Sequence, residues 1–401
     1  MAEVQVRNSQ TGPADRTGKE CRMFAFRTAI NVSCGFGAVD GIGDAVKGMG
    51  YNRVLFVTDP GLVKAGLAER VTKKLEAAGI GFSIFDTVEP NPRDSSIEAA
   101  WEAVKHEPIE AVVGLGGGSS MDAAKAAATL ATNGGKLAQY DGAGTIKKPV
   151  LPIIAIPTTA GTGSEVTSNA AITDAARHYK MSLRSPYLIP SLAILDPGLL
   201  AGLPARIAAE SSMDAIIHAA EGFTSNKANA LSDSLAVQAL EFLCPNIRAF
   251  IGRRSNKEAA ENMLLGSMFA GTVIGNTGTG ADHALARALG GARDTPHGLA
   301  CALMYPYVVR YNFIADPAKY RKLAQLLGLS VCCLSDSALC DALVAELFRL
   351  SDDLGIPTKL SAIGVERSDL PGIAEVAAGN SGPNPRSTSA KELLALLEEA
   401  F

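Results

Sequence analysis

The chain has 401 residues, of which 47% are hydrophobic and 19% are charged. This length is enough for two ordinary domains that each bury a core. The formal net charge of −4 leaves no surplus of lysine and arginine for a phosphate backbone or an anionic membrane, so nucleic acid is excluded as a partner. No apolar run approaches the roughly 20 residues that span a bilayer, which excludes a membrane-spanning segment.

The compartment is predicted from the cysteines and from the N-terminus. Seven cysteines are scattered without a CxxC pair, and an odd count argues against a disulfide framework. The N-terminus lacks the basic and then apolar pattern of a signal peptide. We therefore expect a cytoplasmic protein, in which residues 1–22, polar and without pattern, form a disordered extension.

The first half of the chain alternates short apolar runs with helix-like segments. Continuous apolar strands that are separated by helices indicate a parallel sheet covered on both faces. The expected strands are residues 53–58, 82–85, 110–115 and 151–156.

The strand-like runs stop after Asp196-Pro197-Gly198, and long stretches rich in alanine and leucine follow with a period of 3.6 residues. Examples are residues 231–251, 258–275 and 338–354. We expect an α/β domain over 23–205 and a helical domain over 206–401. The alternative is that residues 200–206 form a plain loop inside one domain.

A glycine-rich turn leaves the third expected strand and leads into an alanine-rich helix, and we expect Asp122 at the start of that helix to belong to the same cofactor site. Without a Cβ atom, Gly117 and Gly118 let the backbone approach a pyrophosphate, and Ser119 offers a hydroxyl and an N–H group at the helix N-terminus. In this strand-to-helix context the loop predicts a dinucleotide site. The alternative is a tight structural turn.

Two further features belong to the expected cofactor site. Asp59 ends the 53–58 strand, where a carboxylate accepts from an adenosine ribose hydroxyl and repels a 2′-phosphate, so NAD is expected over NADP. An aspartate in a surface turn is the alternative. A second loop, residues 157–165, follows a strand and carries Thr158, Thr159 and Thr162, whose hydroxyls suit a phosphate or a ribose, although such clusters are often only loops.

Three of the five histidines form a pattern with one aspartate. Asp214 and His218 are four residues apart in a helix-like segment, which places them on one face. His283 opens a second such segment, and His297 follows fourteen residues later beyond a Gly290-Gly291 break. One carboxylate and three imidazoles, without a thiolate, suit Fe²⁺ or Zn²⁺, and less often Mn²⁺, Co²⁺ or Ni²⁺.

The alternative for each of these histidines is an ordinary core residue that binds nothing. His106 and His178 lie outside the pattern, and we expect both to be surface or loop residues.

From residue 24 to the C-terminus the chain resembles the iron-containing (group III) alcohol dehydrogenases. The similar motifs occur in family order, and they are the 116–125 glycine loop, the 157–165 loop, the Asp214/His218/Glu221 helix, His283 with Pro296-His297-Gly298, and Asn384-Pro385-Arg386. The resemblance implies a Rossmann-like dinucleotide-binding α/β domain followed by an all-α metal-binding domain, which is a dehydroquinate-synthase-like architecture. It also implies a homodimer or larger homo-oligomer.

The resemblance also assigns roles to single residues. It places Asp59 and Asn91 on the adenosine side of the cofactor, Gly118 and Ser119 at the pyrophosphate, and Asn169 near the substrate. The side chains expected near the ribose and the nicotinamide are Thr158, Thr159, Thr162 and Lys180.

One position departs from the family pattern. Many members carry a second histidine four residues after the third metal ligand, where this chain has Arg287. That histidine is associated with proton relay and substrate shape, so both are in question here. An arginine there either pairs with a carboxylate or phosphonate on the substrate or faces a helix neighbour.

The expected activity is hydride transfer between NAD(P) and a small alcohol or its aldehyde or ketone, with the metal as a Lewis acid. A hydroxy acid or a phosphonate-bearing compound is the alternative substrate. Other open classes are a dehydroquinate-synthase-like lyase, a metal-free reductase of the maleylacetate type, and a scaffold without chemistry.

Overall fold

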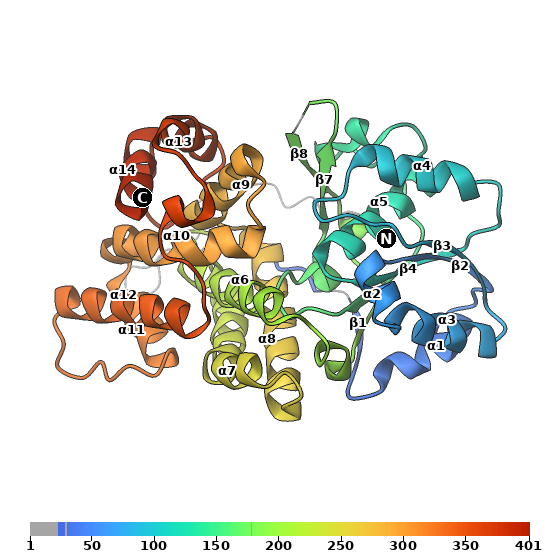
Figure 1. Cartoon of the computed structure of the whole chain (residues 1–401), viewed down its shortest axis with the longest axis horizontal. Helices are drawn as coiled ribbons and strands as arrows, with labels where there is room; N and C mark the ends of the chain where they lie inside the picture. Colours follow the sequence, from blue (N-terminus) through green and yellow to red (C-terminus); the bar gives the residue numbers. More distant parts are fainter. Residues whose placement is uncertain (1–22, 29, 178) are drawn as a thin grey trace.

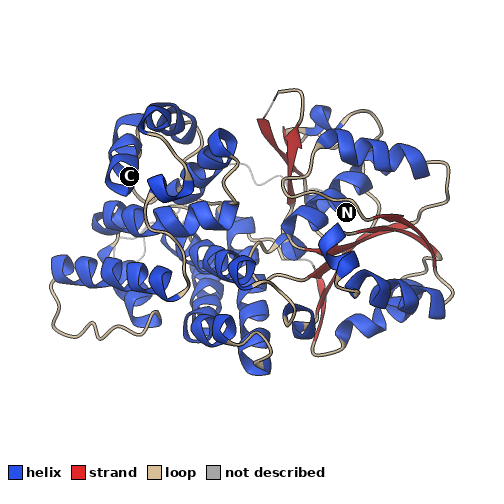
Figure 2. Cartoon of the chain, viewed as in Figure 1, coloured by secondary structure: helices blue, strands red, loops and turns tan. Residues whose placement is uncertain are grey.

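The computed structural model describes residues 23–28, 30–177 and 179–401. The expectations for residues 1–22 and for His178 lie outside the described residues. Strands occupy the blue-to-green half of the chain, and the yellow-to-red half is helical (Figures 1 and 2). This arrangement confirms the expected α/β part followed by a helical part.

The larger sheet has six strands in the order β1-β9-β6-β4-β2-β3, and every pairing in it is parallel. Its strands are β1 (Asn31–Cys34), β2 (Arg53–Val57), β3 (Gly81–Phe85), β4 (Ala111–Gly116), β6 (Ile153–Pro157) and β9 (Leu192–Leu195). The four strands expected from apolar runs are therefore present. The edge strand β1 is fully exposed and carries no apolar run, which explains why the sequence did not reveal it.

Helices cover both faces of this sheet, as continuous apolar strands require. In β2, Val54 and Phe56 join the core that contains α1 and α3, whereas Leu55 and Val57 join the core beneath α4 and α5. This alternation is the two-residue period of a strand. The helices are α1 (Ile42–Gly48), α2 (Pro60–Lys64), α3 (Leu67–Ala77), α4 (Asp94–Val104) and α5 (Gly118–Asn133).

A smaller sheet, in the order β5-β8-β7, was not expected from the sequence. Its strands are β5 (Gly142–Ala143), β7 (Asn169–Asp174) and β8 (Tyr179–Arg184). In β8, Met181 and Leu183 are buried, while Lys180 and Arg184 point to the other, accessible face. The polar alternation of this hairpin lacks the continuous apolar run that identified the other strands.

In the described part of the chain no strand follows β9, and nine α-helices complete the fold. They are α6 (Ala205–Thr224), α7 (Ala230–Gly252), α8 (Lys257–Thr277), α9 (Ala281–Arg293), α10 (His297–Asn312), α11 (Pro317–Leu326), α12 (Asp336–Asp353), α13 (Leu370–Ala378) and α14 (Ala390–Ala400). Helix α6 contacts α7, α8 and α10 and is buried from Ser212 to Thr224. Polar groups on α6 are therefore held inside protein.

The α/β part and the helical part contact each other closely where two glycines face each other. Gly163, in the loop after β6, has a φ of +62°, and a Cβ atom there would lie 2.4 Å from the Cα atom of Gly271 on α8. A side chain at Gly271 would likewise lie 2.6 Å from the Cα atom of Gly163. Only glycine fits at either position, because both neighbours are backbone atoms.

We expect Gly163→Ala to lower the free energy of unfolding by about 2 to 4 kcal/mol, because it combines a left-handed backbone with an overpacked contact. Thermal and urea unfolding measure this loss. Gly252→Ala is the control, since an added Cβ atom there meets nothing within 4 Å and the residue ends an exposed helix turn. Equal stability of the two variants would contradict the backbone contact.

Candidate metal and dinucleotide site

Helix α6 supplies the first two expected metal ligands. Asp214 and His218 are 2% and 5% exposed, and the Nε2 atom of His218 lies 3.7 Å from the Oδ1 atom of Asp214. The spacing of four residues places both side chains on one helix face, as expected. They are thus held together inside the protein by the packing of the helix that carries them.

Helices α9 and α10 bring the other two histidines to the same carboxylate oxygen. The Nε2 atoms of His283 and His297 lie 3.4 Å and 4.0 Å from the Oδ1 atom of Asp214. The ring of His283 stacks on that of His218 with centroids 4.5 Å apart. All three imidazoles therefore lie within 4.0 Å of one carboxylate oxygen, although His218 is outside the group of ligand atoms that all lie within 4.8 Å of one another.

The polar atoms at this point lack protein partners. The Oδ1 atom of Asp214 and the Nε2 atom of His283 are buried, and neither has a hydrogen-bond partner among the described residues. Such buried unsatisfied groups are costly and rare unless an ion or a water completes them. One carboxylate oxygen and three imidazole nitrogens are a suitable donor set for a divalent ion.

Contacts behind the imidazoles fix their orientation. The Nδ1 atom of His218 lies 3.2 Å from the carbonyl oxygen of Gly161, and that of His283 lies 2.7 Å from the Oε2 atom of Glu221. Each contact uses the Nδ1–H group and leaves the Nε2 lone pair facing Asp214, the arrangement that metal-binding histidines show. Glu221 was noted only as part of a motif, and no role followed from the sequence.

Burial and neighbouring groups shift the pKa values of these side chains. Burial lowers the pKa of His297 to about 3 and also lowers the pKa of His218. For His283, burial lowers the pKa, but Cys301 and Glu221 outweigh it and the net direction is upward. For Asp214, burial raises the pKa, but the adjacent histidines outweigh it and the net direction is downward. Asp214 therefore offers an ionised carboxylate, and His283 has to be free of a proton on its Nε2 atom to bind a metal there.

The structure adds Cys301, which the sequence analysis did not consider as a ligand. It lies one turn after His297 on α10, with its Sγ atom 3.8 Å from the Nε2 atom of His297. Ligand atoms of Asp214, His283, His297 and Cys301 all lie within 4.8 Å of one another. Burial raises the pKa of the Cys301 thiol, which keeps it protonated and a weak donor. The i, i+4 spacing from His297 was its only sequence signal.

The glycine turn lies where the sequence placed it, between β4 and the N-terminus of α5. A Cβ atom at Gly118 would lie 2.9 Å from the Thr162 side chain, so the two small-residue loops touch. Gly117 and Ser119 remain partly accessible. The Oγ1 atom of Thr159 is buried near Gly117 and has no hydrogen-bond partner in the described part of the chain, and Thr158 is also buried. The free N–H groups of a helix start and an unpaired hydroxyl suit a phosphate or a ribose.

Asp59 lies beside this turn. Its Oδ1 atom accepts from the N–H groups of Gly61 and Leu62 and caps α2, and the Ser120 hydroxyl donates to its Oδ2 atom at 3.3 Å. The carboxylate is thus fixed next to the glycine turn. Its cap role and its expected ribose role are compatible, because a carboxylate has several lone pairs.

Asn91 and Lys180 lie next to each other on the accessible side of β8. The Nζ atom of Lys180 donates to the Oδ1 atom of Asn91 at 2.9 Å, and the Nδ2 atom of Asn91 donates to Asp294 at 3.2 Å. Asp294 belongs to the turn between α9 and α10. This chain of bonds connects the α/β part to the turn that precedes His297.

Two expected site residues form hydrogen bonds within the protein. Asp122 accepts from the Ser164 hydroxyl at 2.7 Å and from the Ala171 N–H group at 2.8 Å, so its direct contact with a cofactor stays a prediction. Asn169 has an exposed side chain, and its carbonyl oxygen accepts from the buried Lys125 at 2.8 Å. His106 is exposed in the turn after α4, as expected.

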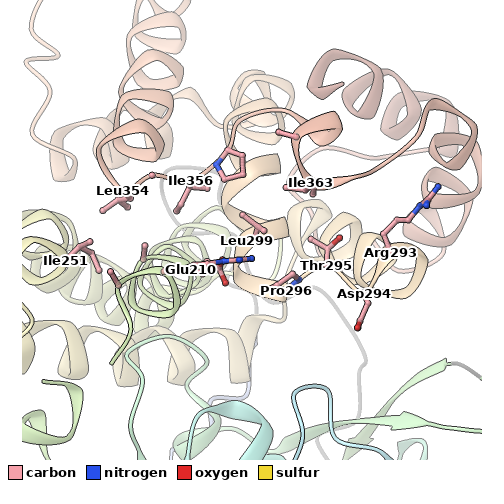
Figure 3. A pocket seen from close by; sticks show the side chains of 16 residues that line it. Glu210, Ile251, Arg293, Asp294, Thr295, Pro296, Leu299, Leu354, Ile356 and Ile363 are labelled. Atoms are coloured by element: carbon pink, nitrogen blue, oxygen red, sulfur yellow. The ribbon is translucent and has the colours of Figure 1, made fainter. Parts of the chain in front are cut away.

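A pocket of about 570 Å³ lies behind the turn that leads to His297, not at the metal ligands. Thr295, Pro296 and Leu299 form part of its wall, with Ile356 facing them (Figure 3). None of the four expected ligands lines it. We therefore base the function on the ligand cluster and not on this pocket.

A parallel α/β part with a phosphate-type turn, next to a helical part with a buried Asp/His₃ cluster, defines a metal-dependent dehydrogenase. The chain belongs to the iron-containing alcohol dehydrogenase family. Residues 30–197 match the family model "Iron-containing alcohol dehydrogenase", and residues 208–401 match "Fe-containing alcohol dehydrogenase family, C-terminal". The family resemblance of the sequence is thereby confirmed.

Individual relatives agree with this assignment. The chain is 38% identical to 1,3-propanediol dehydrogenase of Klebsiella pneumoniae over 95% of its length and 99% of the relative's. It is 36% identical to lactaldehyde reductase of Escherichia coli K12, over 94% and 100% of the two chains. A crystal structure of 1,3-propanediol oxidoreductase superposes with a TM-score of 0.92 at 38% identity, covering 95% of this chain and 100% of the other.

The activity class follows from the family. The chain is an alcohol dehydrogenase that interconverts alcohols and aldehydes, and the family uses NAD(H) and a divalent metal ion. This assignment decides against the lyase, the metal-free reductase and the inactive scaffold. Among the described residues, no helix is long and apolar enough for a bilayer.

Proposed function

We propose that this chain is an NAD-linked dehydrogenase of small alcohols and aldehydes, with Fe²⁺ or another divalent ion held by Asp214, His218, His283 and His297. The observation that carries the proposal is the convergence of three Nε2 atoms within 4.0 Å of one unpartnered carboxylate oxygen. A divalent ion bound there supplies Lewis acidity, which polarises a carbonyl oxygen and stabilises an alkoxide.

The residues of the chain do the remaining work by positioning. The turn at Gly117, Gly118 and Ser119 binds the pyrophosphate at the start of α5, while Thr159 and Thr162 contact the ribose side. Lys180, expected on the ribose and nicotinamide side, donates to Asn91, expected on the adenosine side, so the two side chains hold each other beside the proposed cofactor site. Asn169 is exposed at the start of β7, and we expect it to lie near the substrate. Fixed geometry of this kind provides much of the rate enhancement.

Further expectations complete the proposal. The dinucleotide-binding domain comprises residues 23–205 and the metal-binding domain residues 206–401, which agrees with the last strand ending at Leu195 and α6 beginning at Ala205. We propose the cytoplasm as compartment, because no disulfide joins the described cysteines. A homodimer or larger homo-oligomer is proposed from the family resemblance.

The test is a spectrophotometric assay of the purified chain, loaded with Fe²⁺ or Zn²⁺, against short alcohols with NAD⁺ and short aldehydes with NADH. We expect turnover in both directions, lost on chelation and restored by the metal. Metal analysis by mass spectrometry should give about one ion per chain. Turnover that survives complete metal removal would contradict the proposed role of the cluster.

Coenzyme choice gives a separate prediction. We expect Asp59→Ser to raise kcat/KM with NADPH relative to NADH by about tenfold, because it removes the charge that opposes a 2′-phosphate. Serine still caps α2, so stability should stay within about 0.5 kcal/mol. Asp316→Ser is the matched control, because Asp316 caps α11 in the same way in the helical part. If the two variants show the same coenzyme ratio, Asp59 does not contact the ribose.

A further inference from the structure

Arg287 is a charged residue beside the metal cluster that the proposed mechanism does not use. It follows His283 by four residues on α9, so the two side chains share a helix face with Cβ atoms about 5 to 6 Å apart. The side chain is accessible to solvent, yet surrounding protein desolvates the guanidinium and lowers its pKa. Arg287 therefore lies next to the place where the substrate carbonyl is expected.

The guanidinium has only neutral partners. Its Nη1 atom donates to the Thr279 hydroxyl at 3.3 Å, and its Nη2 atom donates to the carbonyl oxygen of Asn380 at 3.2 Å. These long bonds orient the group but leave most of its five N–H donors free. The sequence left two alternatives for Arg287, a substrate anion or a helix neighbour as its partner. In the structure, the guanidinium donates to Thr279 and Asn380, and most of its N–H groups remain available to a ligand.

No carboxylate neutralises this charge. Among the described residues, no acidic oxygen lies within 4.0 Å of Arg287, whereas Arg293 on the same helix pairs with Asp369 at 2.7 Å. Glu221 is close enough to affect the pKa of Arg287, but its oxygens accept from Gly280, Asp282 and His283. The carboxylate of Glu221 is thus already engaged.

Two more cations face the same region from β8. Lys180 and Arg184 lie on the accessible face of that strand, which contacts α9, and neither has a carboxylate partner within 4.0 Å in the described part of the chain. Burial lowers the pKa of Lys180 and of Arg287. After burial, the charge of Asp122 raises and that of Arg287 lowers the pKa of Lys180, while Glu221 raises and Arg184 lowers the pKa of Arg287. Three cations in one region favour an anion as an occupant.

We infer that Arg287 binds an anionic end group of the substrate, so that this enzyme acts on short aldehydes and alcohols carrying a carboxylate, sulfonate or phosphonate. The inference rests on the proposed function. A guanidinium binds such planar or multi-oxygen anions through two parallel N–H bonds. The one-turn separation from His283 restricts the substrate to a few carbons between the anion and the reacting carbon.

A neutral diol would bind next to Arg287 less tightly than an anionic substrate. It would leave the partly desolvated guanidinium without a counter-charge, and hydrogen bonds to charged partners are the stronger ones. The cofactor's pyrophosphate is the competing anion, but its expected place is the N-terminus of α5, on the α/β part of the chain. The experiment separates these two anions.

The test measures NADH oxidation by the metal-loaded enzyme with two anionic aldehydes, succinic semialdehyde and sulfoacetaldehyde, and two neutral ones, butanal and propanal. We expect the native enzyme to favour the anionic members by about tenfold or more in kcat/KM. Arg287→Gln should lower this preference by about 10- to 100-fold, mainly through KM for the anionic aldehydes. Arg287→Lys should retain part of it, because charge remains without the guanidinium fork.

Arg293→Gln is the matched control, since it removes an arginine from the same helix where Asp369 already pairs with it. The anionic preference should not change in this variant. The inference is wrong if the native enzyme shows no anionic preference, or if Arg287→Gln weakens NADH binding instead of aldehyde binding.

A binding measurement keeps the result independent of turnover. Calorimetric titration of 4-hydroxybutyrate into the enzyme–NADH complex should show binding that Arg287→Gln weakens by about 10- to 100-fold, with 1-butanol as the neutral comparison. If neither type of aldehyde is reduced, the proposed function fails, and the titration still decides whether Arg287 binds the anion. Equal binding by native enzyme and Arg287→Gln would overturn the inference.

Discussion

Replacing His283 with alanine is expected to abolish tight metal binding and alcohol oxidation together. His283 is 2% exposed and its Nε2 atom faces Asp214. The nearby thiol of Cys301 is a poor substitute, because burial raises its pKa and keeps it protonated. Loss of the ion removes several kcal/mol of transition-state stabilisation, so kcat should fall by about 10³-fold or more. Metal content by mass spectrometry and steady-state kinetics measure the two effects.

Two controls separate metal loss from misfolding. His106→Ala removes an exposed histidine and should retain about one ion per chain. His297→Ala removes a ligand that is 34% exposed at the start of α10, where the cost to the core is small, and should also lose metal. Circular dichroism and NADH binding report whether each variant is folded. A folded His283→Ala variant that keeps both the metal and the activity would refute the site.

Four strands of the large sheet were predicted from their apolar runs, whereas the edge strand β1 and the short, buried strand β9 were not. Residues such as Val54 to Val57 give an uninterrupted apolar run that only a covered parallel strand needs. The edge strand β1 and the β7–β8 hairpin lack that pattern, since one face of each is accessible. Their pairing depends on partners far away in the sequence, and no local signal contains that information.

The clustering of the four proposed ligands was predictable in part, for a similar reason. Asp214 and His218 are related by helix periodicity, which is a local property. That His283 and His297 reach the same oxygen depends on how α9 and α10 pack against α6, and only the family resemblance indicated it. The thiol of Cys301 and the bond between Asn91 and Asp294 became visible only in the structure, because both arise from tertiary packing.

Glu221 illustrates a role that periodicity allowed but did not assign. It lies seven residues after Asp214, two helical turns along the same face of α6. Its Oε2 atom accepts from the N–H group of Gly280 at 2.8 Å and from His283, while its Oε1 atom accepts from Asp282 at 2.9 Å. One carboxylate therefore fixes both the start of α9 and the tautomer of a metal ligand.

We expect Glu221→Gln to weaken metal binding by about 10- to 100-fold, the usual effect of removing a group that orients a metal ligand. Glutamine has one acceptor oxygen where three N–H donors converge, so one donor is left unpaired or His283 moves its proton to the Nε2 atom. A proton there blocks the lone pair that faces Asp214. Competition with a chelator of known affinity measures the dissociation constant.

Excess metal distinguishes this variant from the loss of a ligand. Since Glu221→Gln retains all four donors, saturating Zn²⁺ or Fe²⁺ should restore most of its kcat, whereas His283→Ala should stay inactive. Glu346→Gln is the control, because it neutralises another buried carboxylate, 4% exposed on α12 and paired with Arg248, and should lower stability without changing metal affinity. If Glu221→Gln holds metal as tightly as the native chain, the bond to His283 is structural only. Glu221→Gln and Glu346→Gln both change a buried carboxylate, but only Glu221 contacts a proposed metal ligand. A loss of metal affinity in Glu221→Gln alone is therefore the result that the positioning role of Glu221 requires.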